Sequence, residues 1–322
     1  RIITRSHGAA LLGADQPNVI IIQTDEHNLR TLGCYRDQMS PEQAFVWGKG
    51  NKVDTPHIDS LAKDGVLCTN YFASSPVCTP SRASWVSGLY PQATGSPGNN
   101  MPLKDSIVTF AEVLRKRGYA TSYLGKWHLD GNAKPGWGPA RKFGFSDNRF
   151  MFNRGHWKKF ELTEDGPQVA SRKKGQPSYD LNGADEKSFA TDWLVDRTLD
   201  ILERDKKKPF CLMLALPDPH GPNTVRAPYD TMYDRYGLEV TDPIQVNETS
   251  NAIDGLARFC SAQLVQAGTY GFVDPIFFSG EETSKPFHPH GGSLWALDVE
   301  GRALHAVPTA PFPPRRSHRA IH

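Results

Sequence analysis

The sequence predicts an α/β fold with a mostly parallel sheet and helices on both of its faces. This prediction rests first on three runs with the length and composition of buried strands: residues 17–27 (PNVIIIQTDEH), 119–124 (YATSYL) and 209–216 (PFCLMLAL). It rests also on the helical segments between them, because strands that alternate with helices are typical of parallel sheets. Polar residues follow each run, and ligands bind outside the carboxyl ends of the strands in such sheets.

Helical patterns and their end signals justify the elements between these strands. Residues 55–63 begin with Thr-Pro, and Gly65 follows as a stop signal. Residues 106–117 carry apolar side chains at helical spacing, and Gly118 ends this segment. Residues 188–205 form the longest such pattern, with leucine, threonine and isoleucine on one face. We therefore expect three helices in these positions.

The remaining segments are less regular. Residues 66–73 (VLCTNYFA) are expected to form a further strand, whereas residues 132–176 are rich in Gly, Pro, Lys and aromatic residues and indicate a long loop or insertion. Residues 1–16 are expected to be either a signal remnant or a flexible N-terminus. Periodicity fades from about residue 260, so residues 260–322 are expected to be an aperiodic tail, either disordered or out of its natural reading frame.

Composition excludes several classes of protein. The chain has 322 residues, of which 38% are hydrophobic and 22% charged, which is ordinary for a globular protein and sufficient for one large α/β domain. A net charge of +2 gives no indication of binding to nucleic acid or to an acidic membrane surface. No apolar run is long enough to span a bilayer. The small apolar residues at 8–14 (GAALLGA) favour a periplasmic or secreted protein.

The stretch VCTPSRASWVSG, residues 77–88, places a cysteine at the start of an expected helix. Thr79 is the expected cap of a helix whose first turn holds Pro80. Cys78 then lies at the positive end of the helix dipole, where free backbone N–H groups favour an anion. Arg82, four residues further on, lies on the same helical face as Cys78. A nucleophile and a guanidinium at an anion-binding helix start suit attack on a sulfate or phosphate ester.

Two motifs in the chain resemble the two sulfatase signatures. CTPSR at residues 78–82 is similar to Cys-x-Pro-Ser-Arg, and GYAT at 118–121 leading into GKWH at 125–128 is similar to the second signature. Asp25 after the first strand and the Asp-Pro-His that ends at His220 match the family in order and spacing. The chain therefore resembles the type I, formylglycine-dependent sulfatases, which are arylsulfatase-like members of the alkaline phosphatase superfamily. The resemblance implies an alkaline-phosphatase-like fold, incomplete at the C-terminus.

The resemblance implies that Cys78 is not a cysteine in the working protein. In type I sulfatases a formylglycine-generating enzyme oxidises this cysteine to an aldehyde, whose hydrate carries two hydroxyl groups. One attacks sulfur and the other expels sulfate. The family holds Ca²⁺ or Mg²⁺ beside this group, which implies Asp25, Glu26 and side chain 78 as ligands. Glu26 stands where the family more often has Asp, Gln or Asn.

The resemblance also implies roles for four further residues. Arg82 neutralises charge around the aldehyde hydrate and the cation. Lys126 binds a sulfate oxygen, and His128 contacts the formylglycine hydroxyl as a base. His220 binds sulfate and protonates the leaving alcohol. Taken without the family, four of the site residues have an ordinary alternative: a strand-end cap for Asp25, surface side chains for Lys126 and His128, and a structural histidine at 220.

The sequence departs from the family after residue 228. Sulfatases complete the cation site with a later strand that ends in Asp followed by Asn or His, usually with Gly next, and then supply another lysine. No such motif follows here, since Asp274 precedes a proline and Asp298 a valine. We therefore expect residues 17–259 to form an incomplete sulfatase catalytic domain that binds its cation weakly.

Three functions follow from these expectations. The leading hypothesis is hydrolysis of sulfate esters on a carbohydrate or an aryl alcohol. The nearest alternative is hydrolysis of phosphonate or phosphate monoesters, a chemistry found in the same superfamily. The third is an inactive truncated remnant that binds sulfated glycans or nothing. Under the leading hypothesis the partners are a sulfated small molecule or glycan and the formylglycine-generating enzyme.

Overall fold

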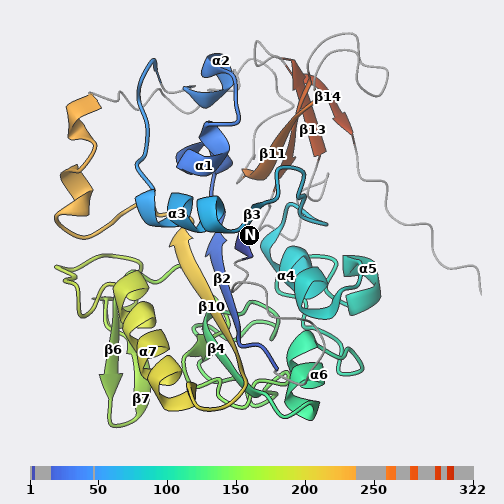
Figure 1. The fold of residues 1–322 in the computed structure, drawn as a ribbon, viewed down its shortest axis with the longest axis vertical. Helices are drawn as coiled ribbons and strands as arrows, with labels where there is room; N and C mark the ends of the chain where they lie inside the picture. Colours follow the sequence, from blue (N-terminus) through green and yellow to red (C-terminus); the bar gives the residue numbers. More distant parts are fainter. Residues whose placement is uncertain are drawn as a thin grey trace, which may run out of the picture. The chain divides into compact units, whose positions relative to one another are not determined.

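A parallel four-stranded sheet forms the centre of the first of two compact units of the chain (Figure 1). The computed structural model describes residues 16–45 and 48–236, together with short strands at 2–3, 259–265, 276–281, 294–298 and 303–307. The central sheet has the order β2-β10-β4-β5, and each neighbouring pair is parallel. Its strands are β2 (Val19–Asp25), β4 (Ala120–Lys126), β5 (Met151–Phe152) and β10 (Phe210–Pro219). The predicted mostly parallel sheet is therefore confirmed.

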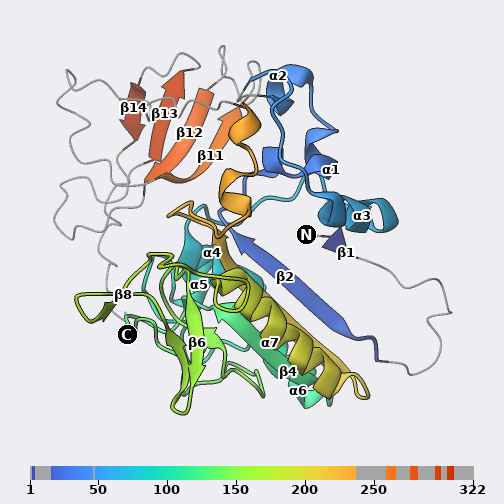
Figure 2. The same ribbon diagram turned by 90° about the vertical axis from the view of Figure 1, so that its left-hand side faces the viewer.

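Strand β10 divides the hydrophobic core into two layers. Leu212 and Leu214 pack with Leu194 of helix α7 (Ala190–Asp205) on one face of the sheet. Met213 and Ala215 pack on the other face, in a cluster that includes residues of helices α4 (Cys78–Ser87) and α6 (Phe110–Lys116). Figure 1 shows α7 on one side of the strands and α4 and α6 on the other, and in Figure 2 α7 lies in front of the strands. Helices therefore cover both faces, as predicted.

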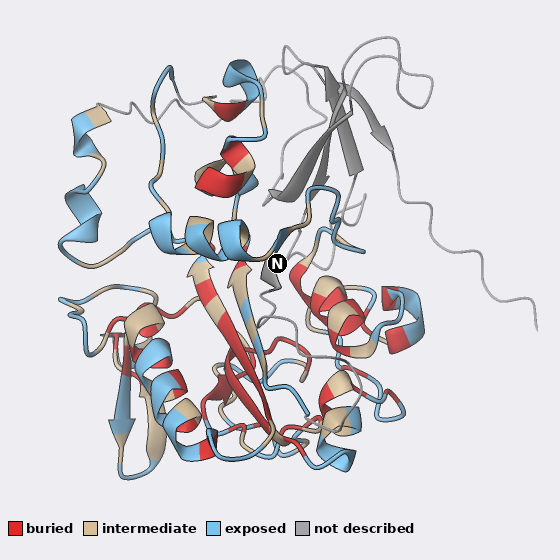
Figure 3. Cartoon of the chain, in the orientation of Figure 1, coloured by how far each residue is buried: buried red, intermediate tan, exposed pale blue. Residues whose placement is uncertain are grey.

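Burial is concentrated where these layers meet, in β4, β10 and the sheet-facing sides of α4 and α7 (Figure 3). Full burial of a leucine side chain contributes about 1.5–3 kcal/mol relative to exposure, so each layer is a substantial source of stability. Strand β2 lies at one edge of the sheet, and its Ile20 and Ile22 are exposed, whereas Ile21 packs against the core. The residues that hold the sheet together are thus mainly those of its central strands.

The predicted helices are confirmed, with shorter bounds for two of them. Thr109 caps α6, because its hydroxyl accepts a hydrogen bond from the Glu112 N–H while the Glu112 carboxylate accepts one from the Thr109 N–H. Helix α3 (Pro56–Asp64) has proline in its first turn and ends before Gly65. The remaining short helices are η1 (Leu29–Thr31), α1 (Gly33–Arg36), α2 (Pro41–Ala44), α5 (Pro91–Thr94), η2 (Tyr229–Thr231) and η3 (Asp234–Tyr236).

Two local predictions need correction. The strand expected at 66–73 is limited to β3 (Val66–Leu67), which pairs with β1 (Ile2–Ile3). The insertion expected as a loop contains β5 and two hairpins, and a two-residue turn joins the strands of the first hairpin. The hairpin strands are β6 (Phe160–Thr163), β7 (Gly166–Val169), β8 (Arg172–Lys173) and β9 (Gln176–Pro177).

The chain divides into two compact units, Arg1–Glu239 and Val240–His322. The second unit contains an antiparallel sheet that the sequence did not predict, in the order β11-β12-β13-β14. Its strands are β11 (Phe259–Val265), β12 (Ile276–Glu281), β13 (Leu294–Asp298) and β14 (Ala303–Val307). Most of the expected N-terminal signal remnant and the rest of the expected tail lie outside the described residues. Among the helices that the structure describes, none has the length and apolar character needed to cross a membrane.

Candidate active site

The carboxyl ends of three neighbouring strands carry the site. Strand β2 ends at Asp25, β4 ends at Lys126, and β10 ends just before His220. Strand β10 lies between the other two, and all three run parallel. Their carboxyl ends therefore lie side by side. The polar side chains that follow the three predicted strands are thus close together, as this topology requires.

The Asp25 carboxylate lies at the centre of the charged groups. Lys126 Nζ is 2.6 Å from Asp25 Oδ2, and Arg82 Nη2 is 3.5 Å from Asp25 Oδ1. All three side chains are almost completely excluded from solvent. Burial favours the protonated acid, but the charges of Lys126 and Arg82 outweigh it and hold the pKa of Asp25 below its usual range. Asp25 is therefore a buried carboxylate balanced by two cations.

Arg82 reaches this carboxylate from helix α4. Its Nη1 donates a hydrogen bond to the Lys126 backbone carbonyl at 2.6 Å, and the Tyr123 hydroxyl donates to the same carbonyl at 2.6 Å. The Arg82 bond ties α4 to the end of β4, while the Tyr123 bond lies within β4. Arg82 thus connects the helix that carries Cys78 with the strand that carries Lys126.

Cys78 is the first residue of α4 and is buried. The prediction that Thr79 caps this helix is wrong, because the N-cap is Val77 and the Thr79 hydroxyl instead donates to the His128 carbonyl at 3.0 Å. Ligand atoms of Cys78 and His220 lie within 4.8 Å of each other, and the Cys78 thiol also influences the pKa of His128. Position 78 therefore lies at a helix N-terminus and near two histidines, an arrangement that suits a group exchanging protons.

His128 has a left-handed backbone conformation, with φ of 61°. Non-glycine residues adopt this region at a cost and do so often at functional sites. Its Nε2 lies 3.0 Å from Asn100 Oδ1, and Asn100 has φ of 64°. Burial lowers the pKa of His128, which favours its neutral form. A neutral imidazole beside Cys78 can accept a proton.

His220 and Glu26 form an ion pair at the ends of β10 and β2. His220 Nε2 is 3.0 Å from Glu26 Oε1, and Glu26 has φ of 55°. Burial alone would lower the pKa of His220, but hydrogen bonds to Cys78 and Glu26 raise it to about 9. Since the folded state stabilises the protonated ring, His220 carries a proton at neutral pH.

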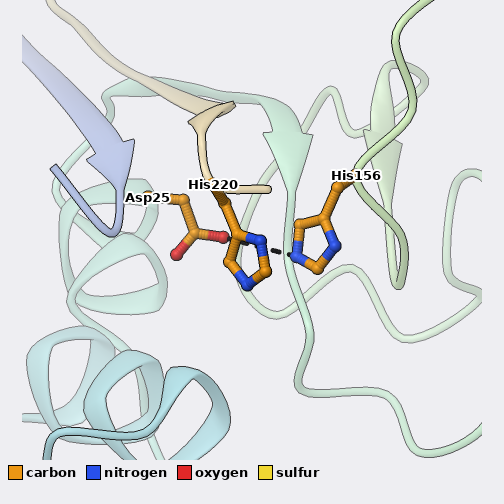
Figure 4. A group of neighbouring side chains, drawn as sticks. All are labelled: Asp25, His156 and His220. Carbon is orange, nitrogen blue, oxygen red and sulfur yellow. Dashed lines mark ion pairs between the residues drawn. The ribbon is translucent and has the colours of Figure 1, made fainter. Parts of the chain in front are cut away.

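His156 also lies in the site, although it is not among the residues expected there from the sequence. Its ring stacks on that of His220, with centroids 3.4 Å apart and an interplanar angle of 12° (Figure 4). Its Nε2 is 2.6 Å from Lys126 Nζ and 3.9 Å from Asp25 Oδ2. Burial and the charges of Lys126 and His220 lower the pKa of His156. The basic and aromatic character of residues 153–158 is visible in the sequence, but nothing there shows that this segment returns to the strand ends.

Among the residues that the structure describes, two overlapping groups of side chains offer atoms to a metal ion. Ligand atoms of Glu26, Cys78 and His220 lie within 4.8 Å of one another, and so do those of Asp25, His156 and His220. In the second group, however, the Lys126 ammonium is within hydrogen-bond distance of Asp25 and His156. The carboxylates of Asp25 and Glu26 are the donors that suit a hard cation such as Ca²⁺ or Mg²⁺, although Ca²⁺ takes six to eight oxygens in all.

Comparison with known proteins identifies the family. The sulfatase family model matches residues 17–259 of the chain. This chain belongs to the sulfatase family. Among curated proteins, this sulfatase chain is similar to the ulvan-active sulfatase of Formosa agariphila, with 32% identity over 68% of the chain and 38% of that protein. It is also 28% identical to the N-acetylglucosamine-6-O-sulfatase of Bacteroides thetaiotaomicron, over 64% of the chain and 31% of that protein.

A solved structure supports the fold. The crystal structure of Ps i-CgsB in complex with k-i-k-neocarrahexaose matches with a TM-score of 0.50 and 22% identity, over 69% of the sulfatase chain and 49% of that chain. The sulfatase chain therefore spans half or less of the length of the relatives described here.

Proposed function

We propose that this sulfatase chain hydrolyses sulfate esters of carbohydrates, using a formylglycine made from Cys78. The observation that carries this proposal is the position of Cys78. It lies at the N-terminus of α4, close to His220 and electrostatically coupled to His128, and shares the site with the buried Lys126 and Arg82. A helix N-terminus and several cationic side chains suit a tetrahedral oxyanion.

The groups around position 78 fit an aldehyde hydrate, since each of its two hydroxyls needs a hydrogen-bond partner and two imidazoles are present. The hydrate would supply the hydroxyl nucleophile that a thiol does not provide. His128, whose neutral form is favoured, takes a proton at side chain 78. In this proposal His220 donates a proton to the departing alcohol.

Lys126 and Arg82 provide positive charge on either side of Asp25. In this proposal the Lys126 ammonium binds a sulfate oxygen, while Arg82 keeps Asp25 ionised and oriented. Asp25, Glu26 and the hydroxyl of side chain 78 would hold a Ca²⁺ or Mg²⁺ ion. Such an ion would stabilise a deprotonated hydroxyl and neutralise charge that develops on the sulfate.

The names of the relatives support a sulfated glycan as the substrate class. One is described as active on ulvan and another on an N-acetylglucosamine 6-O-sulfate. A formylglycine-generating enzyme is the maturation partner in this proposal. The proposal also includes export to the periplasm or the medium, which the apolar residues at 8–14 support.

Maturation and product release test the proposal. The full chain is produced with a formylglycine-generating enzyme, and a peptide containing position 78 is examined by mass spectrometry for the aldehyde. Release of sulfate from 4-nitrophenyl sulfate and from sulfated oligosaccharides is then compared with release of phosphate or phosphonate from the matching aryl esters. We expect sulfate release to dominate, to require the cation, and to disappear in Cys78→Ala but not in the control Cys68→Ala.

Two results would contradict the proposal. Faster hydrolysis of the phosphate or phosphonate ester would assign the chain to the other chemistry of the superfamily. An unmodified cysteine at position 78, with no hydrolysis of any ester and no bound divalent cation, would favour the inactive remnant.

A further inference from the structure

Residues 153–158, called the arm below, lie beside the site and are held in place by buried contacts. Asn153 is fully buried, and its Nδ2 donates to the carbonyls of Gly131 and Ala133 at 3.0 and 2.9 Å. Gly155 has φ of 115°, and a Cβ at this position would lie 2.4 Å from the Trp157 ring. The close approach of backbone and indole therefore requires glycine.

Lys158 fastens the end of this arm to β10. Its side chain is buried, and its ammonium forms an ion pair with Asp218, two residues before His220. Thr191 at the start of α7 donates to the other oxygen of Asp218 at 2.6 Å. A buried ion pair with further hydrogen bonds holds a well-defined geometry. The arm and the segment that carries His220 are thus held together by a link that lies outside the reacting groups.

His156 is presented by this arm to two residues of the site. An ammonium group only donates hydrogen bonds, so His156 Nε2 accepts the bond from Lys126 Nζ at 2.6 Å. The face of the same ring lies against His220 at 3.4 Å, as Figure 4 shows. One imidazole therefore restricts both the Lys126 ammonium and the His220 ring.

We propose that His156 is a positioning residue that orients Lys126 and His220 toward the sulfate group. This inference rests on the proposed function and adds to it a residue from the insertion between β5 and β6. The hydrogen bond keeps the ammonium of Lys126 at the strand ends, where it can bind an oxyanion. The stacking contact keeps the His220 ring in the orientation in which it delivers a proton. His156 itself transfers no proton and binds no sulfate oxygen.

Two substitutions separate the contacts. His156→Phe keeps an aromatic ring against His220 and removes the acceptor for Lys126. His156→Gln keeps an acceptor and removes the ring. His57→Gln, at an exposed position of α3, is the matched control. Each full-length variant is matured and loaded with Ca²⁺. We then measure kcat and KM for 4-nitrophenyl sulfate, the inhibition constant of inorganic sulfate, and the thermal unfolding temperature.

We expect His156→Phe to weaken inhibition by sulfate and to lower kcat/KM by about ten- to a hundredfold, because a misplaced ammonium contacts the anion poorly. His156→Gln should retain sulfate inhibition near that of the wild type and lose mainly kcat. The unfolding temperatures and the control variant should match the wild type. If His156→Phe does not fold, His156→Gln alone tests the inference. In that variant kcat should fall while the inhibition constant of sulfate stays near the wild-type value.

Wild-type sulfate inhibition in His156→Phe together with wild-type kcat in His156→Gln would overturn the inference. Failure of the proposed function is recognised separately, as a wild-type chain that does not hydrolyse the ester. In that case the affinity of the wild type and of His156→Phe for sulfate, measured by calorimetry, still tests His156. The reason is that the contact between Lys126 and His156 is proposed to affect sulfate binding. A wild type that also binds no sulfate would overturn both proposals.

Discussion

Lys126 Nζ lies 2.6 Å from Asp25 Oδ2, and both side chains are almost wholly buried. The Asp25 carboxylate is in turn within 3.5 Å of the buried Arg82 guanidinium. One carboxylate thus compensates two cations in a region with little water. Removing a partner from such a group leaves uncompensated buried charge, which is far more costly than losing a surface ion pair.

Asp25→Asn should therefore destabilise the fold. We expect a loss of about 3–5 kcal/mol in the free energy of unfolding, measured by urea denaturation. The control is Asp105→Asn, because Asp105 also pairs with an arginine, Arg141, but is fully exposed. This control should change the free energy of unfolding far less than Asp25→Asn does. Equal effects of the two substitutions would show that Asp25 does not compensate buried charge.

Asn100→Gly should impair turnover without loss of stability. The substitution removes the side chain that contacts His128 Nε2, while glycine adopts the φ of 64° at this position readily. We expect kcat for an aryl sulfate to fall about ten- to a hundredfold, because the imidazole is no longer held in one orientation. Asn182→Gly is the control, since Asn182 has φ of 46° and is exposed away from these contacts. Full activity of Asn100→Gly would exclude an orienting role for Asn100.

Asp147 should make stability depend on pH in the acid range. Burial raises its pKa, but hydrogen bonds from Arg149 and Arg204 outweigh this and lower the pKa to about 2. Because the folded-state pKa is below the unfolded value, the stabilisation is complete above about pH 4 and is lost as the pH falls toward 2. Both arginines are partly exposed, so we expect Asp147→Asn to cost about 1–2 kcal/mol at pH 7.

Urea denaturation of wild type and Asp147→Asn at pH 7 and pH 3 provides the measurement. The difference between the two proteins should shrink at the lower pH. A difference that stays constant would mean that Asp147 acts through packing and not through its charge.

Gly125→Ala should disrupt the centre of the sheet. Gly125 has φ of 93°, and a Cβ there would lie 1.9 Å from the Ala215 carbonyl oxygen on the neighbouring strand. We expect a loss of roughly 4 kcal/mol or more, or failure to fold. Gly118→Ala is the matched control, with φ of 87° and no atom within 4 Å of the added methyl group. It should cost only about 1–2 kcal/mol, which is the backbone strain alone. Similar losses of stability in Gly125→Ala and Gly118→Ala would exclude a clash with the Ala215 carbonyl as the cause.

Much of the sheet and most residues of the site could be predicted from the sequence. Continuous apolar runs predicted β2 and β10, although only β10 is buried as such a run implies, since β2 is an edge strand with Ile20 and Ile22 exposed. Their parallel arrangement then required Asp25, Lys126 and His220 to meet at one edge. The helices were predicted because capping residues and apolar spacing are local signals, as Thr109 and Glu112 illustrate.

The parts that were not predicted depend on contacts between distant residues. His156 enters the site because Lys158 pairs with Asp218, which lies 60 residues further along the chain. No local pattern encodes such a contact. Thr79 has the chemistry of a helix cap, but its hydroxyl instead donates to the His128 carbonyl. In both cases a tertiary interaction decides what a side chain does.

The tie between the arm and the sheet has a consequence for the rest of the insertion. The Ala190 N–H donates to the Lys158 carbonyl, and the Phe160 N–H donates to the Ser188 carbonyl. These two hydrogen bonds hold the two ends of the stretch from 161 to 187 together. Tyr179 of this stretch packs against the rings of His156 and Trp157, so only changes that leave Tyr179 in place are separated from the strand ends. The turn at Glu164 and Asp165, which is exposed, is therefore a place to graft a peptide tag or a fluorescent reporter without perturbing the chemistry.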